Sequence, residues 1–149
     1  MQVNDMTQPF ARQHNRTPID NPENAYIILV EDDPNSYLVI EELLKYAGFK
    51  HFYHRGSGAK LIQLIEALPQ VDLVLLDIGL PGEDGFSVLK RLRAHPQSAR
   101  AHIAAVTANI MHQTRLRAKD AGFDSFISKP IHPDKICDQI RRMLNGHTF

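Results

Sequence analysis

Side chains that can bind or transfer charge follow four of the short apolar runs in this sequence. They are Glu31, Asp32 and Asp33 after residues 26–30, Asp77 after 71–76, Thr107 after 102–106, and Ser128 and Lys129 after 124–127. Each of these residues alone is commonly a helix cap or a solvated surface group. If the apolar runs are neighbouring parallel strands, however, the carboxylates, the hydroxyl and the ammonium meet at one edge of a sheet.

Grouped carboxylates make this edge of the sheet a candidate cation site. Like-charged carboxylates at low dielectric raise one another's pKa unless a cation binds between them. Hard oxygen ligands with room for water suit Mg²⁺, which also prefers phosphate oxygens, and a lysine beside such an ion suits a phosphoryl group. The sequence contains neither GxxxxGK(S/T) nor GxGxxG, so no glycine loop of that kind holds a nucleotide. A carboxylate that itself accepts the phosphoryl group is the simplest interpretation.

The apolar patterning predicts five strands that alternate with five helices. Strands are expected at 26–30, 50–54, 71–76, 102–106 and 124–127, and helices at 34–47, 58–68, 86–94, 111–121 and 133–144. Residues 71–76 form a nearly unbroken aliphatic run, typical of a strand buried on both faces of a parallel sheet. Right-handed crossovers then give an open α/β sheet with helices on both faces and a ligand site at the carboxyl ends of its strands.

Four segments carry a resemblance to a known family. They are IILVEDDPN at 27–35, VLLDIGLPGEDGF at 74–86, AAVTAN at 104–109 and FISKP at 126–130. In order and spacing they resemble the CheY-like receiver domain of bacterial two-component response regulators, over roughly residues 25–146. The resemblance implies a flavodoxin-like (βα)5 doubly wound sandwich with a five-stranded parallel sheet of order 2-1-3-4-5, which agrees with the alternation of elements.

The resemblance implies a phosphoacceptor and a magnesium site. Asp77 is then the residue that takes up the phosphoryl group, in line, from a kinase histidine. Asp32, Asp77 and the backbone carbonyl of Gly79 would bind Mg²⁺ directly, with Mn²⁺ as a substitute ion, and Glu31 would reach the ion through water. Asp33 is interpreted instead as a helix cap, because it directly precedes a proline.

The same resemblance implies residues that respond to the phosphoryl group. Lys129 would place its ammonium on a phosphoryl oxygen, and its bond to the following proline is a candidate cis peptide. Thr107 would hydrogen-bond another phosphoryl oxygen and draw its loop inward. Phe126, without the motif a routine core residue, then becomes an aromatic switch that turns inward. Gly79 and Asn109, which stand two residues after Asp77 and Thr107, would set the lifetime of the phosphate.

Partners follow from the resemblance as well. The phosphoryl donor would be a sensor histidine kinase or a histidine phosphotransfer protein. A downstream effector protein would bind the face formed by the helix at 111–121, the strand at 124–127 and the helix at 133–144. Met111, His112 and Leu116 are interpreted as possible interface residues on this face.

Two further groups of residues are interpreted as structural. The turn that presents Gly79 is expected to be shaped by Leu80, Pro81, Asp84 and Gly85. A local basic stretch is expected to be a solvated face, and its members are Lys90, Arg91, Arg93 and Arg100.

Composition limits the classes of protein that fit. The 149 residues contain 17 Lys and Arg against 17 Asp and Glu, so the formal net charge is zero and no global field attracts nucleic acid. No apolar run reaches the roughly 18 to 20 residues of a membrane span, and a single cysteine is consistent with the cytoplasm. We expect a flexible tail at 1–24, one receiver domain at 25–146 and a short tail at 147–149.

These features predict a single-domain response regulator that is phosphorylated on Asp77 and acts through phosphorylation-dependent binding of another protein. It would be a signalling module and not an enzyme, beyond its own Mg²⁺-dependent phosphorylation and dephosphorylation. Too little chain lies at either end for a helix-turn-helix output domain. An alternative is a receiver-fold scaffold that is not phosphorylated, which the intact Asp32, Thr107 and Lys129 disfavour. A hydrolase acting through an aspartyl phosphate would need a second acid at the position of Gly79.

Overall fold

The computed structural model describes residues 19, 21–80, 82–109 and 111–148. The predicted tail at 1–24 therefore lies mostly outside the described residues, as do Pro81 of the predicted turn and Phe149 of the predicted second tail. A short 3-10 turn, η2 (Pro22–Asn24), precedes the first strand. The N–H of Lys50 donates to the carbonyl of Glu23 in this turn at 3.0 Å, so η2 is tied to the start of the second strand.

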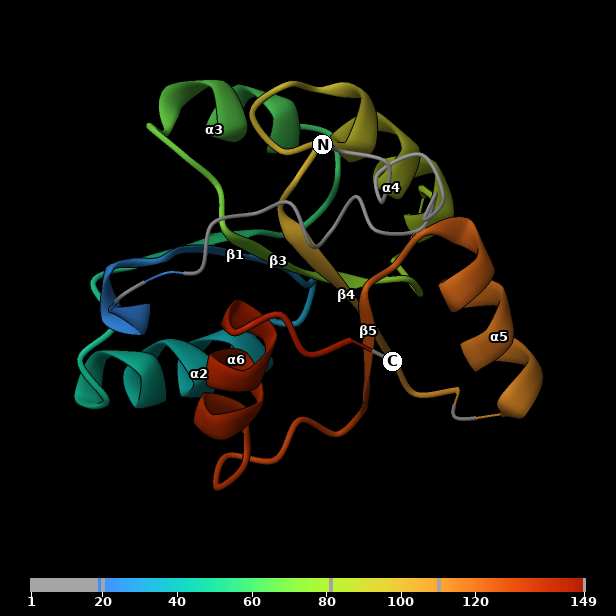
Figure 1. Cartoon of the computed structure of the whole chain (residues 1–149). Helices are drawn as coiled ribbons and strands as arrows, with labels where there is room; N and C mark the ends of the chain where they lie inside the picture. The colour runs from blue at the N-terminus through green and yellow to red at the C-terminus, as the bar shows by residue number, and fades with distance from the viewer. Residues whose placement is uncertain (1–18, 20, 81, 110, 149) are drawn as a thin grey trace, which may run out of the picture.

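Five parallel strands form one sheet in the order β2-β1-β3-β4-β5, which confirms the predicted flavodoxin-like order (Figure 1). The strands are β1 (Tyr26–Val30), β2 (His51–Arg55), β3 (Leu73–Asp77), β4 (His102–Thr107) and β5 (Ser125–Ser128). Val30 lies opposite Leu76, and Thr107 lies opposite Ser128. The carboxyl ends of these strands therefore reach nearly the same level of the sheet.

Five α-helices of the described chain cover the two faces of the sheet. They are α2 (Pro34–Tyr46), α3 (Leu61–Ala67), α4 (Gly85–Ala94), α5 (His112–Ala121) and α6 (Ile136–Leu144). Helices α2 and α6 pack on one face, and α3, α4 and α5 lie on the other (Figure 1). In the ranges that the structure describes, no helix combines the length and the apolar character needed to cross a bilayer.

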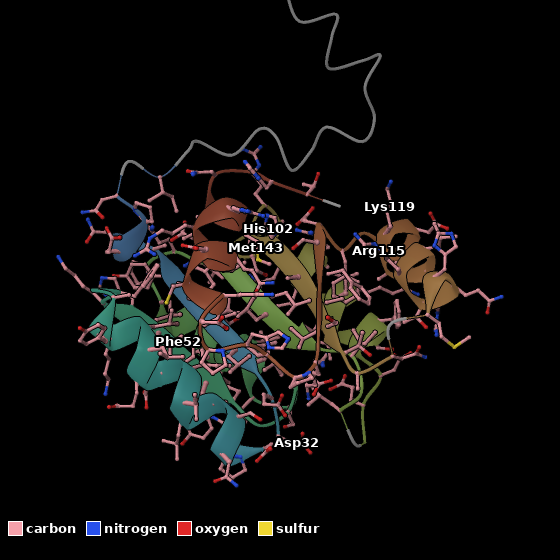
Figure 2. The ribbon with its side chains drawn as sticks, turned by 90° about the horizontal axis from the view of Figure 1, so that it is seen from below. Asp32, Phe52, His102, Arg115, Lys119 and Met143 are labelled. Atoms are coloured by element: carbon pink, nitrogen blue, oxygen red, sulfur yellow. The ribbon has the colours of Figure 1, made fainter. Side chains whose placement is uncertain are left out.

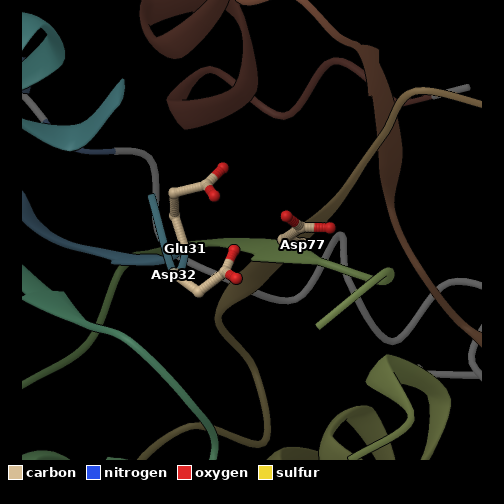
Figure 3. A group of neighbouring side chains, drawn as sticks. All are labelled: Glu31, Asp32 and Asp77. Atoms are coloured by element: carbon tan, nitrogen blue, oxygen red, sulfur yellow. The ribbon is translucent and has the colours of Figure 1, made fainter. Parts of the chain in front are cut away.

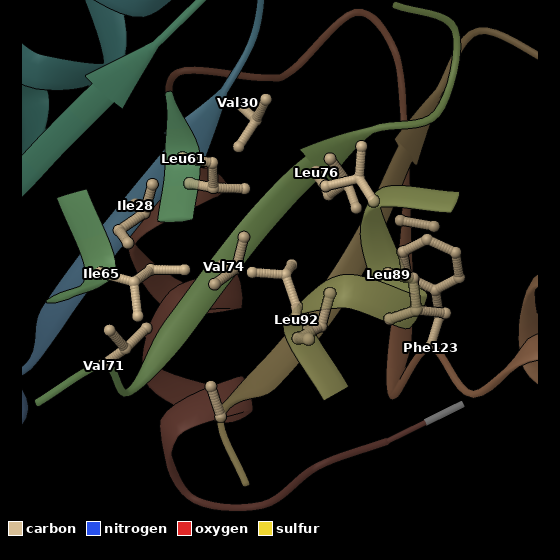
Figure 4. Close-up of a cluster of buried hydrophobic side chains, with 14 of the residues drawn as sticks. Ile28, Val30, Leu61, Ile65, Val71, Val74, Leu76, Leu89, Leu92 and Phe123 are labelled. Carbon is tan, nitrogen blue, oxygen red and sulfur yellow. The ribbon is translucent and has the colours of Figure 1, made fainter. Parts of the chain in front are cut away.

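The central strand β3 is buried on both faces, as its aliphatic run predicts. Its alternate side chains enter different clusters: Val74 and Leu76 pack beneath α3 and α4 (Figure 4), whereas Leu73 and Leu75 face α2 and α6. All four side chains are fully buried. Complete burial of an aliphatic side chain of this size contributes about 1.5 to 3 kcal/mol. The strand is therefore fixed within the core, and so is the backbone of Asp77 at its carboxyl end.

Helix α5 lies against the sheet with little buried surface. Of its ten residues only Ala118 is buried. Two of its arginines reach aromatic rings on neighbouring elements: the guanidinium of Arg117 lies 4.1 Å from the ring centroid of Phe86 in α4, and that of Arg115 lies 5.6 Å from the ring centroid of Phe126 in β5. Figure 2 shows Arg115 at the rim of the molecule. Long polar side chains thus supply part of the contact that apolar residues supply for the other helices.

The prediction of a solvated basic face is wrong for Arg93, although Lys90, Arg91 and Arg100 are exposed. The guanidinium of Arg93 donates to Asp124 Oδ2 at 2.6 Å and to the carbonyl of Gly122 at 3.0 Å. The side chains of Arg93 and Asp124 are only 15% and 3% exposed. Asp124 Oδ2 also accepts the N–H of Ile103 at 2.9 Å. This buried ion pair joins the end of α4 to the turn between α5 and β5.

Candidate functional site

The carboxyl ends of four strands bring the predicted site residues to one edge of the sheet. Glu31 and Asp32 follow β1, Asp77 ends β3, Thr107 ends β4, and Lys129 follows β5. Because these four strands are parallel neighbours, residues far apart in the sequence converge. Figure 3 shows the three carboxylates around a shared space, and Figure 2 places Asp32 at the opposite end of the fold from His102, which begins β4.

Three carboxylates form a compact acidic group. One oxygen from each of Glu31, Asp32 and Asp77 lies within 4.8 Å of the other two. Among the residues that the structure describes, this is the one group of three or more His, Cys, Asp or Glu side chains placed to hold a metal ion. Glu31 and Asp77 are only 1% and 5% exposed, whereas Asp32 is open to solvent. The group therefore combines two buried charges with an accessible third.

Backbone N–H groups orient two of these carboxylates. Glu31 Oε2 accepts the N–H of Asp33 at 3.0 Å, and Asp77 Oδ1 accepts the N–H of Gly79 at 2.8 Å. In each hydrogen bond the donor lies two residues after the acceptor. The loop that follows the strand therefore sets the orientation of the carboxylate at the end of that strand. A Cβ atom on Gly79 would lie 3.4 Å from Asp77 Oδ1. Gly79 thus lies beside Asp77, and its N–H is the group that contacts the carboxylate.

Lys129 places a positive charge between two of the acids. Its Nζ donates a hydrogen bond to Asp77 Oδ2 at 2.6 Å and lies 2.8 Å from Glu31 Oε1. Burial lowers the pKa of Lys129, but the hydrogen bond and charge of Asp77 and the neighbouring carboxylate of Glu31 outweigh this effect and raise the pKa above its ordinary value. The ammonium therefore stays charged at neutral pH. The bond from Lys129 to Pro130 is cis, which confirms the prediction.

The acidic group fits a hard divalent cation. One ammonium faces three carboxylates, so the group keeps an excess of negative charge. Glu31 Oε1 is buried and accepts no hydrogen bond of good geometry, and its charge contact with Lys129 leaves lone pairs available. Carboxylate oxygens beside solvent are the ligands that Mg²⁺ prefers, because the ion retains several waters. The donor set of this chain is therefore suited to magnesium.

Thr107 and Asn109 form a turn beside the acidic group. Thr107 is buried, and its Oγ1 accepts the N–H of Asn109 at 3.0 Å. The carbonyl of Thr107 accepts the N–H of Lys129 at 2.8 Å, which keeps these two residues adjacent. Asn109 Oδ1 accepts the N–H of Met111 at 3.1 Å. The side-chain oxygen of Asn109 is thus engaged with the residue that precedes α5.

Phe126 lies at the border between the core and solvent. It is a residue of β5, half-buried, and it packs against the cluster beneath α3 and α4. Its neighbour on β4 is Ala105, a small residue, and the guanidinium of Arg115 lies over its ring. The predicted switch residue therefore occupies neither a fully buried nor a fully exposed position.

Asp33 is the helix cap that the sequence predicts. Its Oδ1 accepts the N–H of Asn35 at 3.0 Å, and its Oδ2 accepts the hydroxyl of Ser36 at 3.1 Å. The carboxylate of Asp33 is therefore committed to the first turn of α2 and takes no part in the acidic group.

His54 is not among the site residues predicted from the sequence, but it lies at the site. Its Nε2 is 2.6 Å from the carbonyl oxygen of Glu31, and its ring stacks on Tyr37 of α2 with centroids 3.6 Å apart. Because a carbonyl only accepts, Nε2 carries the proton of this hydrogen bond. The predicted strand order could have indicated this position. It places β2 next to β1, and His54 of β2 then pairs with Leu29 of β1, close to the carboxyl end of both strands.

A cavity of about 540 Å³ opens beside the acidic group, between α2 and the loop that follows β5. Glu31 and Lys129 form part of its polar wall. Its apolar wall includes Val39, Ile40, Leu43, Ile131 and Pro133. Two apolar side chains on this part of α2, Leu38 and Val39, are 47% and 50% exposed. The acidic group can therefore be approached over an apolar surface.

The fold and the site together define a doubly wound α/β domain with an acidic pocket at the carboxyl end of its central strand. Residues 27–141 match the family described as the response regulator receiver domain. The chain belongs to this family, whose members are the receivers of two-component signalling.

Curated relatives agree with this family. The chain is 31% identical over 124 residues to the transcriptional regulatory protein GltR of Pseudomonas aeruginosa, an alignment that covers 83% of this chain and 50% of GltR. It is 33% identical over 119 residues to the phosphate regulon transcriptional regulatory protein PhoB of Rhizobium meliloti, which covers 79% of this chain and 51% of PhoB. The chain thus spans about half the length of these relatives.

Solved structures share the fold. The receiver domain of the sensor histidine kinase PA1611 from Pseudomonas aeruginosa, crystallised with a magnesium ion in its active-site cleft, superposes with a TM-score of 0.70 at 29% identity, covering 81% of this chain and 98% of that one. The chemotaxis protein CheY4 of Vibrio cholerae has a TM-score of 0.73 at 19% identity, covering 80% of this chain and 98% of that one. The CheY4 likeness concerns the fold alone.

Proposed function

We propose that Asp77 accepts a phosphoryl group from a sensor histidine kinase or a histidine phosphotransfer protein, and that the phosphorylated chain then signals by binding another protein. One observation carries this proposal: the carboxylate at the end of the central strand has the ammonium of Lys129 at 2.6 Å and two further carboxylates beside it. Membership of the receiver family supports it. In this proposal residues 25–146 are the receiver, and 1–24 and 147–149 are its tails.

Transfer to Asp77 exchanges one bond to phosphorus for another. A carboxylate oxygen of Asp77 forms the new bond while the phosphorus–nitrogen bond of the donor histidine breaks, and the released electron pair stays on the imidazole nitrogen. The N–H of Gly79 holds Oδ1 and Lys129 faces Oδ2, so the carboxylate is oriented before the donor arrives. Preorganised positive charge lowers the barrier, because it stabilises the oxygens on which charge develops.

The acidic group would hold a divalent ion for this chemistry. Asp32, Asp77 and the carbonyl of Gly79 are the proposed direct ligands of Mg²⁺, or of Mn²⁺ in its place, and Glu31 is proposed to reach the ion through water. Such an ion neutralises charge on the carboxylates and on the phosphoryl oxygens. The compact, partly solvent-facing set of oxygens supports this assignment, as does the magnesium in the cleft of the related PA1611 receiver.

Thr107 and Phe126 are proposed to convert phosphorylation into a change at the partner surface. A phosphoryl oxygen would compete with the N–H of Asn109 for the hydroxyl of Thr107, because that contact is local and reversible. Movement of Thr107 toward the phosphoryl group would open space for Phe126 to turn inward, which biases an equilibrium between two arrangements. Gly79 and Asn109 are proposed to set how long the phosphate survives.

Two surfaces are proposed for the two partners. The phosphoryl donor would approach through the cavity beside Lys129 and bind the exposed apolar side chains of α2, Leu38 and Val39. The effector would bind the face formed by α5, β5 and α6. Met111 and Leu116 support that assignment, because they are apolar residues that remain 61% and 44% exposed.

Phosphorylation by a small-molecule donor tests this function directly. The purified chain is incubated with acetyl phosphate and Mg²⁺, and its intact mass is measured. We expect the mass of one added phosphoryl group, which should be absent without the metal ion and absent in Asp77→Asn. The matched control is Asp138→Asn, an exposed aspartate on α6, which should be phosphorylated like the wild type.

Two outcomes would reject the proposed function. A wild-type chain that gains no mass, while circular dichroism shows it folded, would favour the alternative of a scaffold that keeps the receiver fold without phosphorylation. A mass increase that persists in Asp77→Asn would place the modification on another residue.

A further inference from the structure

The backbone of Glu31 is held by strand β2 through both its N–H and its carbonyl. The N–H donates to the carbonyl of Arg55 at 3.0 Å and so extends the pairing of β1 with β2. The carbonyl lies 2.6 Å from Nε2 of His54 and accepts its ring N–H. A side chain of β2 therefore supplies one of the two hydrogen bonds that fasten the chain just after β1 ends.

The carbonyl that His54 contacts belongs to the same peptide unit as the N–H of Asp32. Because a peptide unit is planar, a donor on this oxygen also fixes the direction in which the chain enters Asp32. The carboxylates of Glu31 and Asp77 accept backbone N–H groups, whereas the structure describes no such contact for Asp32 among the residues that it covers. The peptide unit before Asp32 therefore has the larger part in directing this exposed carboxylate toward the acidic group.

The ring of His54 is itself fixed in direction. It stacks on Tyr37 of α2, with the ring centroids 3.6 Å apart and an angle of 3° between the two planes. The imidazole cannot rotate out of this plane without losing the stacked contact. Nε2 therefore stays directed at the carbonyl of Glu31, and one imidazole connects α2 and β2 with the acidic group.

We propose that His54 is a positioning residue, which holds the peptide unit between Glu31 and Asp32 and so keeps the carboxylate of Asp32 directed at the proposed metal site. This inference rests on the proposed role of Asp32 as a ligand and adds the residue that orients it. Groups that orient the ligands commonly set how tightly a site holds its ion. Water could replace the lost donor, but a mobile water would leave the direction of the peptide unit free.

A second histidine on the same strand provides a matched control. The ring of His51 stacks on Tyr26 of β1, with centroids 4.0 Å apart and an angle of 2° between the planes. These two residues are the first of their strands and pair with each other, so they lie at the end of the sheet away from the acidic group. His51→Asn therefore removes the same type of ring and stack from β2 and leaves the contacts of Glu31 in place.

Two substitutions of His54 separate the hydrogen bond from the ring. Both remove the stack on Tyr37. Glutamine carries an amide N–H at about the reach of Nε2, whereas the amide of asparagine ends one bond earlier, near the place of Nδ1. His54→Gln should therefore restore the contact with the carbonyl of Glu31, and His54→Asn should not.

The direction of the peptide unit is measured first, on the full chain and without a metal ion. In a weakly aligned sample, the residual dipolar coupling of the Asp32 N–H reports the direction of that bond. The coupling should fall in magnitude in His54→Asn, because the peptide unit then samples more directions, and should stay near its wild-type value in His54→Gln and His51→Asn. An unchanged coupling in folded His54→Asn would overturn the proposal, whatever happens at Asp77.

Binding of the ion is measured with Mn²⁺ alone, because the paramagnetic resonance signal of the aqueous ion falls as the ion is bound. His54→Asn should weaken binding about three- to tenfold, the loss expected when one ordering hydrogen bond is removed. His54→Gln should bind within about twofold of the wild type. His51→Asn should bind like the wild type.

The two proposals fail in different ways. Wild-type protein that binds no Mn²⁺ would reject the metal site of the proposed function, and the dipolar coupling would still decide whether His54 orients Asp32. Equal affinity in the wild type and His54→Asn, or an equal loss in His54→Gln and His54→Asn, would reject the role of His54 and leave the metal site and phosphorylation of Asp77 intact.

Discussion

The side chain of Glu31 is long enough for its carboxylate to contact both the backbone of the loop that follows β1 and the ammonium of Lys129. Oε2 stays with the N–H of Asp33, while Oε1 reaches to 2.8 Å from Lys129 Nζ. Asp77 shares the same ammonium through Oδ2. Removal of Lys129 would leave two buried negative charges without their cation, which is far more costly than loss of a surface pair. The charge of Lys129 therefore stabilises these two carboxylates in the folded chain.

We predict that the contribution of Lys129 to stability is lost in alkaline solution. The pKa of Lys129 is raised in the folded chain, so its contribution is complete below the pKa of an unfolded lysine, about 10.4, and falls as the pH rises through the folded pKa. Urea unfolding at a series of pH values measures this for the wild type and Lys129→Met. The difference in unfolding free energy should be constant from neutral pH to about pH 10 and shrink above it.

The exposed Lys135, just before α6, gives the control for this prediction. Lys135→Met should differ from the wild type by a small amount that shows no such alkaline decline. A Lys129 difference that grew above about pH 10 would contradict a raised pKa.

The convergence of Glu31, Asp32, Asp77 and Lys129 could be predicted from sequence, because parallel strands that end in polar residues must present them at one edge. The contacts within the group could not, since they depend on loop geometry: nothing in the residue order says that Lys129 would lie between Asp77 and Glu31. His54 was missed for a related reason, because its role comes from an acceptor on the backbone of the neighbouring strand.

The connection from β3 to α4 brings two backbone segments into direct contact. A Cβ atom on Gly85, the first residue of α4, would lie 2.6 Å from Cα of Ile78, closer than real Cβ atoms approach. Asp84 begins the helix by accepting the N–H of Phe86 on Oδ1 at 3.0 Å. Gly85 therefore allows α4 to begin against the residue that directly follows Asp77, and both residues shape this turn as the sequence predicts.

We predict that Gly85→Ala destabilises the chain by about 1 to 3 kcal/mol, the usual cost of atoms forced into packed space. Chemical denaturation measures the loss. Gly56→Ala is the control, because its Cβ would meet nothing closer than a backbone oxygen at 4.0 Å, and it should change stability by less than about 0.5 kcal/mol. Equal stability of the two variants would show that the backbone contact at Ile78 relaxes freely.

The periodicity of apolar residues predicted which segments are helices and which are strands, but it did not predict where these elements begin and end. Helix α3 begins at Leu61 and not at Gly58, because the N–H of Leu61 closes a turn on the carbonyl of Gly58. Helix α6 begins at Ile136, three residues after the predicted start, where the N–H of Ile136 donates to the carbonyl of His132. Both segments are amphipathic as expected, but the residues at which each helix was predicted to begin form local turns instead. Apolar spacing reports which face is buried and carries little information on where hydrogen bonding begins.

Stability is distributed unevenly over the whole molecule. Helix α6 buries Ile136, Ile140, Met143 and Leu144, whereas α5 buries only Ala118. The buried pair of Arg93 and Asp124 fastens the turn that follows α5 and not the helix itself. Segments with few buried apolar contacts open with the smallest free energies. The elements packed around β3 are therefore expected to be the most stable part of the molecule, and α5, beside β5, the least stable helix.

We predict that α5 exchanges its amide hydrogens before any other helix of the described chain. Hydrogen exchange followed by mass spectrometry, on the full chain near neutral pH, should show early deuterium uptake in peptides covering 112–121 and late uptake in those covering 34–46 and 136–144. Protection of α5 equal to that of α6 would mean that the arginine contacts with Phe86 and Phe126 hold the helix as firmly as a buried apolar face.

The exposure of α5 also offers a route for attaching a spectroscopic label. Burial raises the pKa of the Cys137 thiol, the sole cysteine of the chain, so its reactive thiolate is scarce at neutral pH. A second cysteine at an exposed position of α5, such as Gln113→Cys, should react first with a maleimide dye. A fluorophore could thus be attached to α5, the helix that contacts Phe126 through Arg115, without removing the native thiol.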